Sequence, residues 1–147
     1  MKKSKARAEF IDEIFLDIAK KEETLGEEAL SEPESIVGTI WHVYGIVGNG
    51  GLFYFFEHTF NVEEVAKAYE VIGMPEAALI LRKAVAKFPN GRTPPSFERC
   101  MKFLDEHEHF FEALSNEFWK TQERHLARKL AAYIRQHPET FGEYFDR

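Results

Sequence analysis

The sequence predicts an all-α protein, a single-domain compact array of about seven to eight helices around a buried, glycine-rich corner. Apolar residues recur at helical spacing along most of the chain, and no segment shows the strict alternation of a strand. The stretch from Ile36 to Phe56 contains no Asp, Glu, Lys or Arg. A chain of 147 residues has the length of one domain and buries about 70% of its unfolded surface. The uncharged stretch is therefore expected at the centre of one core.

The N-terminal part is predicted to be an amphipathic helix with an acidic outer face. Residues 1–8 are expected to form a flexible basic end and residues 9–147 the domain itself. From Ala6 to Lys21, apolar residues recur three and four positions apart, which is the spacing of one helical face. At 100° per residue, four carboxylates collect on the opposite side. They are Glu9, Asp12, Glu13 and Asp17.

An acidic connection follows this helix. From Glu9 to Glu34 there are ten acidic residues and two lysines, a local balance of −8 that exceeds the net charge of −6 of the whole chain. The negative charge is therefore concentrated in the N-terminal part of the protein.

The uncharged stretch is predicted to form two helices that meet at a corner. Ser35 is expected to cap the first helix. The corner consists of Gly48, Asn49, Gly50 and Gly51, and it is followed by a short apolar helix that ends near Glu57. Glycine adopts positive φ without steric cost, and asparagine is expected in the left-handed conformation at Asn49.

A helical hairpin is predicted next. Asn61 and Glu64 have the spacing of a capping box, and Gly73 is expected to end that helix. Pro75 suits the first turn of the second helix, which Pro89-Asn90-Gly91 is expected to break.

The C-terminal part is predicted to contain further amphipathic helices. Ser96 is expected to cap one of them, with a kink near His107 to His109. A last long helix is expected to turn Leu126, Leu130, Tyr133 and Ile134 inward, and Pro138 is expected to start a short tail helix.

Cysteine usage and hydropathy indicate a cytoplasmic protein. Cys100 is the single cysteine, so no intramolecular disulfide and no thiolate zinc site can form. The basic start is not followed by the apolar run of a signal peptide. The uncharged stretch breaks after Val47, so its pieces have the length of core helices rather than of a membrane span.

Several ordered motifs resemble the DMP19-like family of bacterial proteins, also called domain of unknown function 4375. The motifs are Val47-Gly48-Asn49-Gly50-Gly51 with the aromatic run after it, the hairpin from Ala66 to Leu81, Phe88-Pro89-Asn90-Gly91, and Leu104 to Trp119. After the corner, Leu52 and Tyr54 depart from the family pattern of an aromatic residue and a glutamine.

The resemblance implies an all-helical fold with no established enzymatic activity. The namesake of the family is described as a DNA mimic, an acidic protein that occupies the DNA-binding surface of a transcriptional regulator. The resemblance thus implies another protein as partner, in particular a DNA-binding regulator. Mimicry depends on surface charge rather than on the core motif.

We interpret the charge pattern as a protein-binding surface centred on Glu9, Asp12, Glu13 and Asp17. Carboxylates four residues apart lie about 6 Å apart along a helix axis, a length comparable with phosphate spacing. The alternative is that these carboxylates form an ordinary solvated helix face with no binding role. A second acidic patch comprises Asp105, Glu106, Glu108, Glu112 and Glu117.

Three other kinds of site are weighed against this one. Asp105, His109 and Glu112 share a helical face and have metal-ligand spacing, and Glu106 and His109 have such a spacing as well. Surface carboxylates more often face solvent, however, so neither a metal nor a cofactor is expected.

The runner-up function is a small enzyme with a pocket near the Asn49-Gly50-Gly51 corner. It would use His42 and His58, although His42 is expected as a core or boundary residue.

The last long helix is basic, through Lys120, Arg124, Arg128, Lys129 and Arg135. Without a nucleic-acid reading motif and with a net negative charge, the chain is not expected to bind DNA directly. The basic helix could instead dock against the acidic helix of the same copy or of a second one, which would allow a homodimer.

Overall fold

The computed structural model describes residues 2–58 and 60–145, with side chains from residue 6 onward. Its α-helices are α1 (Lys2–Leu25), α2 (Glu32–Glu57), α3 (Val62–Val71), α4 (Pro75–Lys87), α5 (Phe97–Glu106), α6 (Glu108–Thr121), α7 (Ala127–Arg135) and α8 (Pro138–Phe141). Short turns are η1 (Glu27–Ala29), η2 (Pro89–Gly91), η3 (Gln122–Leu126) and η4 (Gly142–Tyr144). None of the described residues lies in a strand, so the predicted all-α class is confirmed.

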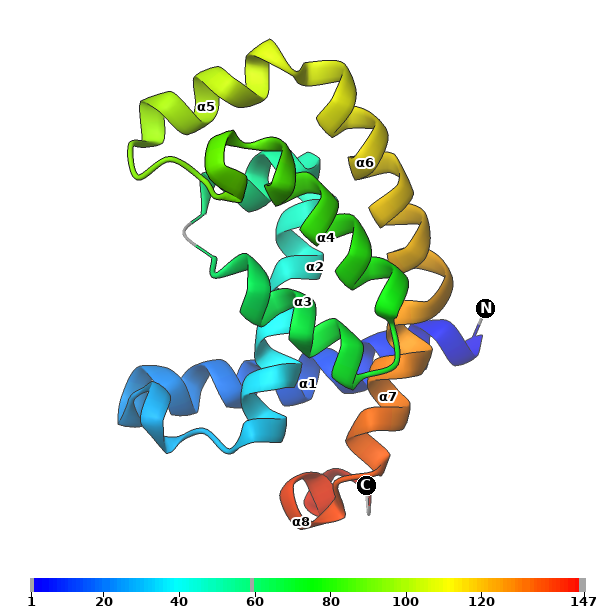
Figure 1. Ribbon diagram of the computed structural model, residues 1–147. Coiled ribbons are helices and arrows are strands. Elements are labelled where there is room, and N and C mark those ends of the chain that lie inside the picture. The colour runs from blue at the N-terminus through cyan, green and yellow to red at the C-terminus, as the bar shows by residue number, and fades with distance from the viewer. Residues whose placement is uncertain (1, 59, 146–147) are drawn as a thin grey trace.

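Helix α2 is the central element of the molecule (Figure 1). The α3–α4 hairpin packs in front of it, α6 follows one side, α5 covers the upper end, and α1 crosses the lower part together with α7. Every α-helix contributes side chains to a single cluster of buried apolar residues. The uncharged stretch therefore lies at the centre of the core, as predicted.

Helix α1 has the predicted apolar face but is longer than predicted. Ile11, Ile14 and Ile18 are buried, and the helix packs against α2 and α7. It begins at Lys2, before the predicted start at Ala6, and continues to Leu25. Met1, Thr59, Asp146 and Arg147 lie outside the described residues, and the predicted division at residues 8 and 9 stays a prediction.

The start of α2 differs from the prediction. Ser31, not Ser35, is the N-cap: its hydroxyl accepts a hydrogen bond from the Glu34 N–H at 3.3 Å. The Glu34 carboxylate accepts one from the Ser31 N–H at 2.9 Å, which completes a capping box. Pro33 adds a preset φ in the first turn. These three features together outweigh the single favourable residue at Ser35.

The glycine-rich corner is a kink at Gly50 and Gly51 rather than a buried loop. Gly51 has φ 64° and ψ −158°, which only glycine adopts readily, whereas Asn49 does not have the predicted left-handed conformation. Gly48 and Asn49 are exposed and the two following glycines half-buried, so the prediction of a buried corner was wrong. Gly48 and Asn49 keep a helical conformation, and the helix is interrupted at Gly50 and Gly51.

The glycines of the kink allow α6 to approach closely. A Cβ atom on Gly48 would lie 3.2 Å from the Trp119 ring, and one on Gly51 would lie 3.1 Å from Ser115 Oγ. The Leu52 N–H, left without a helical partner by the kink, donates to Ser115 Oγ at 2.9 Å. Helix α6 thus fixes the bend in α2.

The remaining boundaries follow the predicted signals. The side chains of Asn61 and Ser96 cap α3 and α5, and Pro75 lies in the first turn of α4. Asn90 has φ 63° in the turn after α4, and the chain breaks at His107 between α5 and α6. The expected inward residues of the last long helix are buried as well.

One feature of the backbone has no counterpart in the predictions. Helices α6 and α7 are joined through η3, a π-helical turn with helical φ and ψ at both flanks. It contains Gln122, the one buried polar residue of the described side chains. None of the described helices combines the length and the apolarity needed to cross a membrane.

Candidate functional site

The acidic surface of α1, defined as Glu9, Asp12, Glu13 and Asp17, is exposed as predicted. Its position follows from the helical period, because burial of the isoleucine face against α2 and α7 turns the carboxylates outward. All four residues are therefore accessible to solvent.

Two of these carboxylates also hold α1 in place. Asp12 Oδ1 accepts a hydrogen bond from Trp41 Nε1 of α2 at 2.6 Å, and Asp17 Oδ2 accepts one from the Tyr144 hydroxyl. Burial raises the pKa of Tyr144, and the hydrogen bond to Asp17 acts in the same direction. Asp12 and Asp17 thus serve the fold as well as contributing charge to the surface of α1.

The second acidic patch belongs to a different end of the molecule. Asp105 and Glu106 lie on α5, and Glu108 and Glu112 follow at the start of α6. Figure 1 places α5 and this part of α6 at the end opposite α1. Asp105, Glu106, Glu108 and Glu112 are therefore separated from the acidic surface of α1, whereas Glu117, the fifth residue of the patch, lies nearer the other end of α6.

The basic helix lies beside the acidic one. Helix α7 packs against α1, and Arg124, Arg128 and Arg135 are exposed. One of them, Arg128, contacts His125 Nδ1 through Nη2 at 3.1 Å. The contact between α1 and α7 leaves the four carboxylates of α1 exposed.

The metal candidates stay on the surface. Asp105, His109 and Glu112 are all exposed. Within the described part of the chain, no group of three or more His, Cys, Asp or Glu side chains is close enough to hold a metal ion.

The residues of the predicted corner pocket are only partly brought together. The rings of His42 and His58 lie edge to face with centroids 6.4 Å apart, and both approach Phe60. His42 is exposed but lines a hollow, so it occupies a boundary position, one of the two expected alternatives, and Asn49 lines none of the hollows described below. Partial burial lowers the pKa of His42, the neighbouring His58 acts in the same direction, and Glu22 opposes them.

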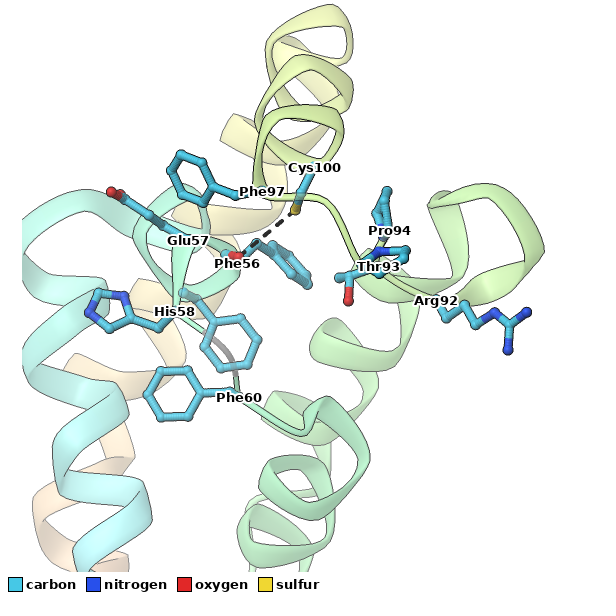
Figure 2. Close-up of a pocket in the computed structure, with 11 residues that line it drawn as sticks. Phe56, Glu57, His58, Phe60, Arg92, Thr93, Pro94, Phe97 and Cys100 are labelled. Atoms are coloured by element: carbon cyan, nitrogen blue, oxygen red, sulfur yellow. Dashed lines mark hydrogen bonds between the residues drawn. The ribbon is translucent and has the colours of Figure 1, made fainter.

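The larger hollow lies beyond the corner, between the end of α2 and the loop before α5 (Figure 2). We call it the aromatic hollow. It has a volume of about 520 Å³, and its principal apolar walls are Phe55, Phe56, Phe60, Pro94, Phe97 and Cys100. The rings of Phe55 and Phe60 stack at 5.1 Å.

Polar residues also line the aromatic hollow, namely Glu57, His58, Arg92 and Thr93. Cys100 Sγ points inward and donates to the Phe56 carbonyl at 3.8 Å, and burial raises the pKa of this thiol, which keeps it neutral. The Arg92 side chain borders the hollow but extends away from it in Figure 2. The aromatic and proline side chains of the hollow are suited to an uncharged group.

A second hollow, of about 300 Å³, lies between α1, η1 and α2. We call it the acidic hollow, because Glu22 and Glu27 line it beside apolar side chains such as Phe15 and Ile18. His42 lines this hollow and contacts Phe60 of the aromatic hollow, with ring centroids 5.4 Å apart. The two hollows are thus adjacent along α2.

A family model described as DMP19-like protein matches residues 28–137. The chain belongs to the DMP19-like family. Comparison with curated proteins and with solved structures gave no match. The suspected resemblance is therefore confirmed over most of the chain.

The matched residues include one candidate site of this DMP19-like protein but not the other. It includes the kink of α2 and the whole aromatic hollow, from Phe55 to Cys100. Glu9, Asp12, Glu13 and Asp17 precede it, as does the whole of α1. Membership of the DMP19-like family therefore describes the fold, and the role of the acidic surface must be argued from its own geometry.

Sequence reasoning missed the loop residues of the aromatic hollow. Thr93, Pro94 and Phe97 were interpreted only as a loop and a helix start. The available signal was Phe97, an aromatic residue directly after the N-cap of α5 that is 58% exposed. A single exposed apolar residue is common on protein surfaces, so this signal becomes informative only with the other aromatic residues of the hollow beside it.

Proposed function

We propose that this DMP19-like protein is a non-enzymatic protein-binding domain that presents the acidic surface of α1 to a basic surface of its partner. The observation that carries the proposal is that all four carboxylates are exposed on one helix whose apolar side is buried. Clustered charge of one sign attracts a partner of the opposite sign and orients its approach.

The best-fitting partner is a DNA-binding protein. Glu9 and Glu13 lie one helical turn apart, about 6 Å along the axis, and Asp12 and Asp17 widen the same face. Lysine and arginine side chains that contact successive phosphates would meet carboxylates at a comparable separation. The resemblance to a family whose namesake is a DNA mimic supports the same class of partner.

The runner-up function, an enzyme with a pocket at the Asn49-Gly50-Gly51 corner, has less support. Both hollows described above lie away from these three residues. Asn49 is exposed on the helix. His58 Nδ1–H donates a hydrogen bond to the Tyr54 carbonyl at 2.7 Å, so this nitrogen is not available as a general base.

Capture of the partner from native cell extract tests the proposal. The wild-type protein is compared with the Glu9→Lys, Glu13→Lys double variant and with a matched control, Glu108→Lys, Glu112→Lys, which reverses two exposed charges at the same spacing on α6. Wild type and control should capture the same DNA-binding protein, the α1 variant should not, and excess duplex DNA should displace it. Capture that survives the α1 reversal would contradict the proposal.

A further inference from the structure

The aromatic hollow and the acidic hollow differ in chemistry but adjoin along α2. The aromatic hollow is lined mainly by aromatic and proline side chains, and the acidic hollow is lined by two carboxylates together with apolar side chains. His42, His58 and Phe60 lie between them with their rings in contact range, at centroid separations of 5.4 to 6.4 Å. A ligand that filled both hollows would pass across these three rings.

We propose that the two hollows form one groove that binds an extended segment of a partner protein, with an apolar side chain in the aromatic hollow and a Lys or Arg side chain in the acidic hollow. The groove is distinct from the acidic surface of α1. It goes beyond the proposed function, because it assigns a second contact with a different chemistry.

The size and lining of the aromatic hollow favour a large apolar side chain. A volume of about 520 Å³ is within the range of small ligand sites and exceeds the volume of any one side chain. Phe97 at its edge is 58% exposed, so an occupant would cover it. Aromatic residues that become buried on association are frequent centres of binding energy.

The charges around the second hollow favour a basic side chain. Glu22 and Glu27 line it, and both are exposed. The histidine ring at the border, His42, has a lowered pKa and is neutral at neutral pH, so it does not oppose a cation there. A lysine or arginine stem can lie on Phe15 and Ile18 while its charged end reaches the carboxylates.

A polypeptide explains the pair of hollows better than a small molecule does. The hollows lie on residues of α1, η1, α2 and α5, so an occupant of both must extend across several elements. An extended chain spans about 3.3 Å per residue and turns successive side chains to alternate sides. Two side chains on the same side of such a segment can therefore enter neighbouring hollows.

Synthetic peptides test the groove directly. The probes are fluorescent peptides with two arginines and one tryptophan, separated by one to four serines, and their binding is measured by anisotropy. At least one spacing should bind. Replacing its tryptophan with alanine, or its arginines with glutamate, should weaken binding by about tenfold or more.

Matched variants locate the binding site. Glu27→Lys and Phe97→Ser should each weaken binding of the best peptide by about tenfold. Glu28→Lys, next to Glu27 but outside the hollow, should not, and neither should Leu79→Ser, which removes a side chain of similar exposure, 65%, from α4. Circular dichroism confirms that each variant is folded.

Each other outcome overturns the proposal. Failure of every spacing to bind at millimolar concentration would exclude the groove, as would equal losses in the Glu27→Lys and Glu28→Lys variants. A peptide without arginine that binds as tightly would show that the aromatic hollow acts alone. The Glu9→Lys, Glu13→Lys variant should bind the peptide like wild type, so the groove and the acidic surface of α1 can fail independently.

Discussion

Glu34 joins two elements through one carboxylate. It accepts hydrogen bonds from the Ser31 N–H and from Lys21 Nζ, at 2.9 Å and 3.0 Å, and so connects the start of α2 to α1. Burial alone would raise the pKa of Glu34, but the hydrogen bonds from Ser31 and Lys21 and the charge of Lys21 outweigh it, and the pKa is lowered. The ionised form is therefore favoured by folding.

Replacing Glu34 with glutamine should destabilise the protein in a pH-dependent way. We expect a loss of about 1 kcal/mol in the free energy of unfolding near neutral pH. A carboxyl whose folded pKa is lowered stabilises the fold above its unfolded pKa of 4.5, and this contribution disappears as the pH falls through the folded pKa. Urea unfolding across this range measures it, with the exposed Glu32→Gln variant as the control. A constant difference at all pH values would contradict the prediction.

Gln122 and Tyr69 form a buried polar pair in the core. The Tyr69 hydroxyl donates to Gln122 Oε1 at 2.8 Å, and burial raises the pKa of Tyr69. Gln122 Nε2 has no hydrogen-bond partner among the described residues. An apolar residue would have been expected at this inward position of a helix, so the pair has a cost that the hydrogen bond only partly offsets.

A double-mutant cycle measures how strongly these two residues are coupled. Tyr69→Phe and Gln122→Met should each cost about 1–3 kcal/mol, because each leaves a buried polar atom unpaired. The double variant should be more stable than the sum of the single effects predicts, by about 1 kcal/mol. Additive losses in denaturant unfolding would show that the hydrogen bond contributes little.

At the scale of the element, the kink in α2 depends on one backbone conformation. Gly51 combines a positive φ with an extended ψ, a region open essentially to glycine alone, and a side chain there would also meet Ser115. Gly45 lies on the same helix with no atom near the place of its missing Cβ. Replacement by alanine is therefore expected to have opposite effects on stability at these two glycines.

Gly51→Ala should cost about 1–3 kcal/mol, through the strained conformation and displacement of Ser115. Gly45→Ala should instead stabilise the protein by about 0.5–1 kcal/mol, because alanine restricts the unfolded chain and favours helix. Thermal and denaturant unfolding of both variants check the pair. If Gly51→Ala proved neutral, the kink could not be the fixed feature described here.

Local signals in the sequence predicted those elements whose boundaries depend on a few adjacent residues. The caps at Asn61 and Ser96 and the proline at Pro75 were predicted because each works within its own turn. The predicted cap at Ser35 was wrong because a better cap lies four residues earlier. The predicted left-handed conformation of Asn49 was wrong because the helix continues through this residue despite its preference for turns. The π-helical turn after α6 changes the helical register without any glycine or proline signal.

At the scale of the whole molecule, the acidic surface was predictable and the groove was not. Helical period alone places Glu9 and Glu13 on the outer face of α1, whatever packs beneath. The two hollows of the proposed groove instead draw on residues far apart in the sequence, such as Glu22 and Phe97, and depend on tertiary packing. Nothing in the local sequence around either residue indicates that it lines a hollow.

The distribution of charge restricts how a partner can approach. The chain has a net charge of −6, yet α7 with its exposed arginines packs beside α1. A positively charged partner is attracted to the carboxylates of α1 and repelled by these arginines. Exposed charges of both signs on one protein favour some orientations of a partner over others.

The affinity for the captured protein, measured as a function of salt concentration, tests the central claim most directly. If the acidic surface of α1 makes the contact, affinity should fall steeply as salt rises, and the Glu9→Lys, Glu13→Lys variant should bind more weakly with a shallower dependence. The Glu108→Lys, Glu112→Lys control should keep the wild-type affinity and slope. Equal slopes and affinities for all three proteins would contradict a partner bound through the carboxylates of α1.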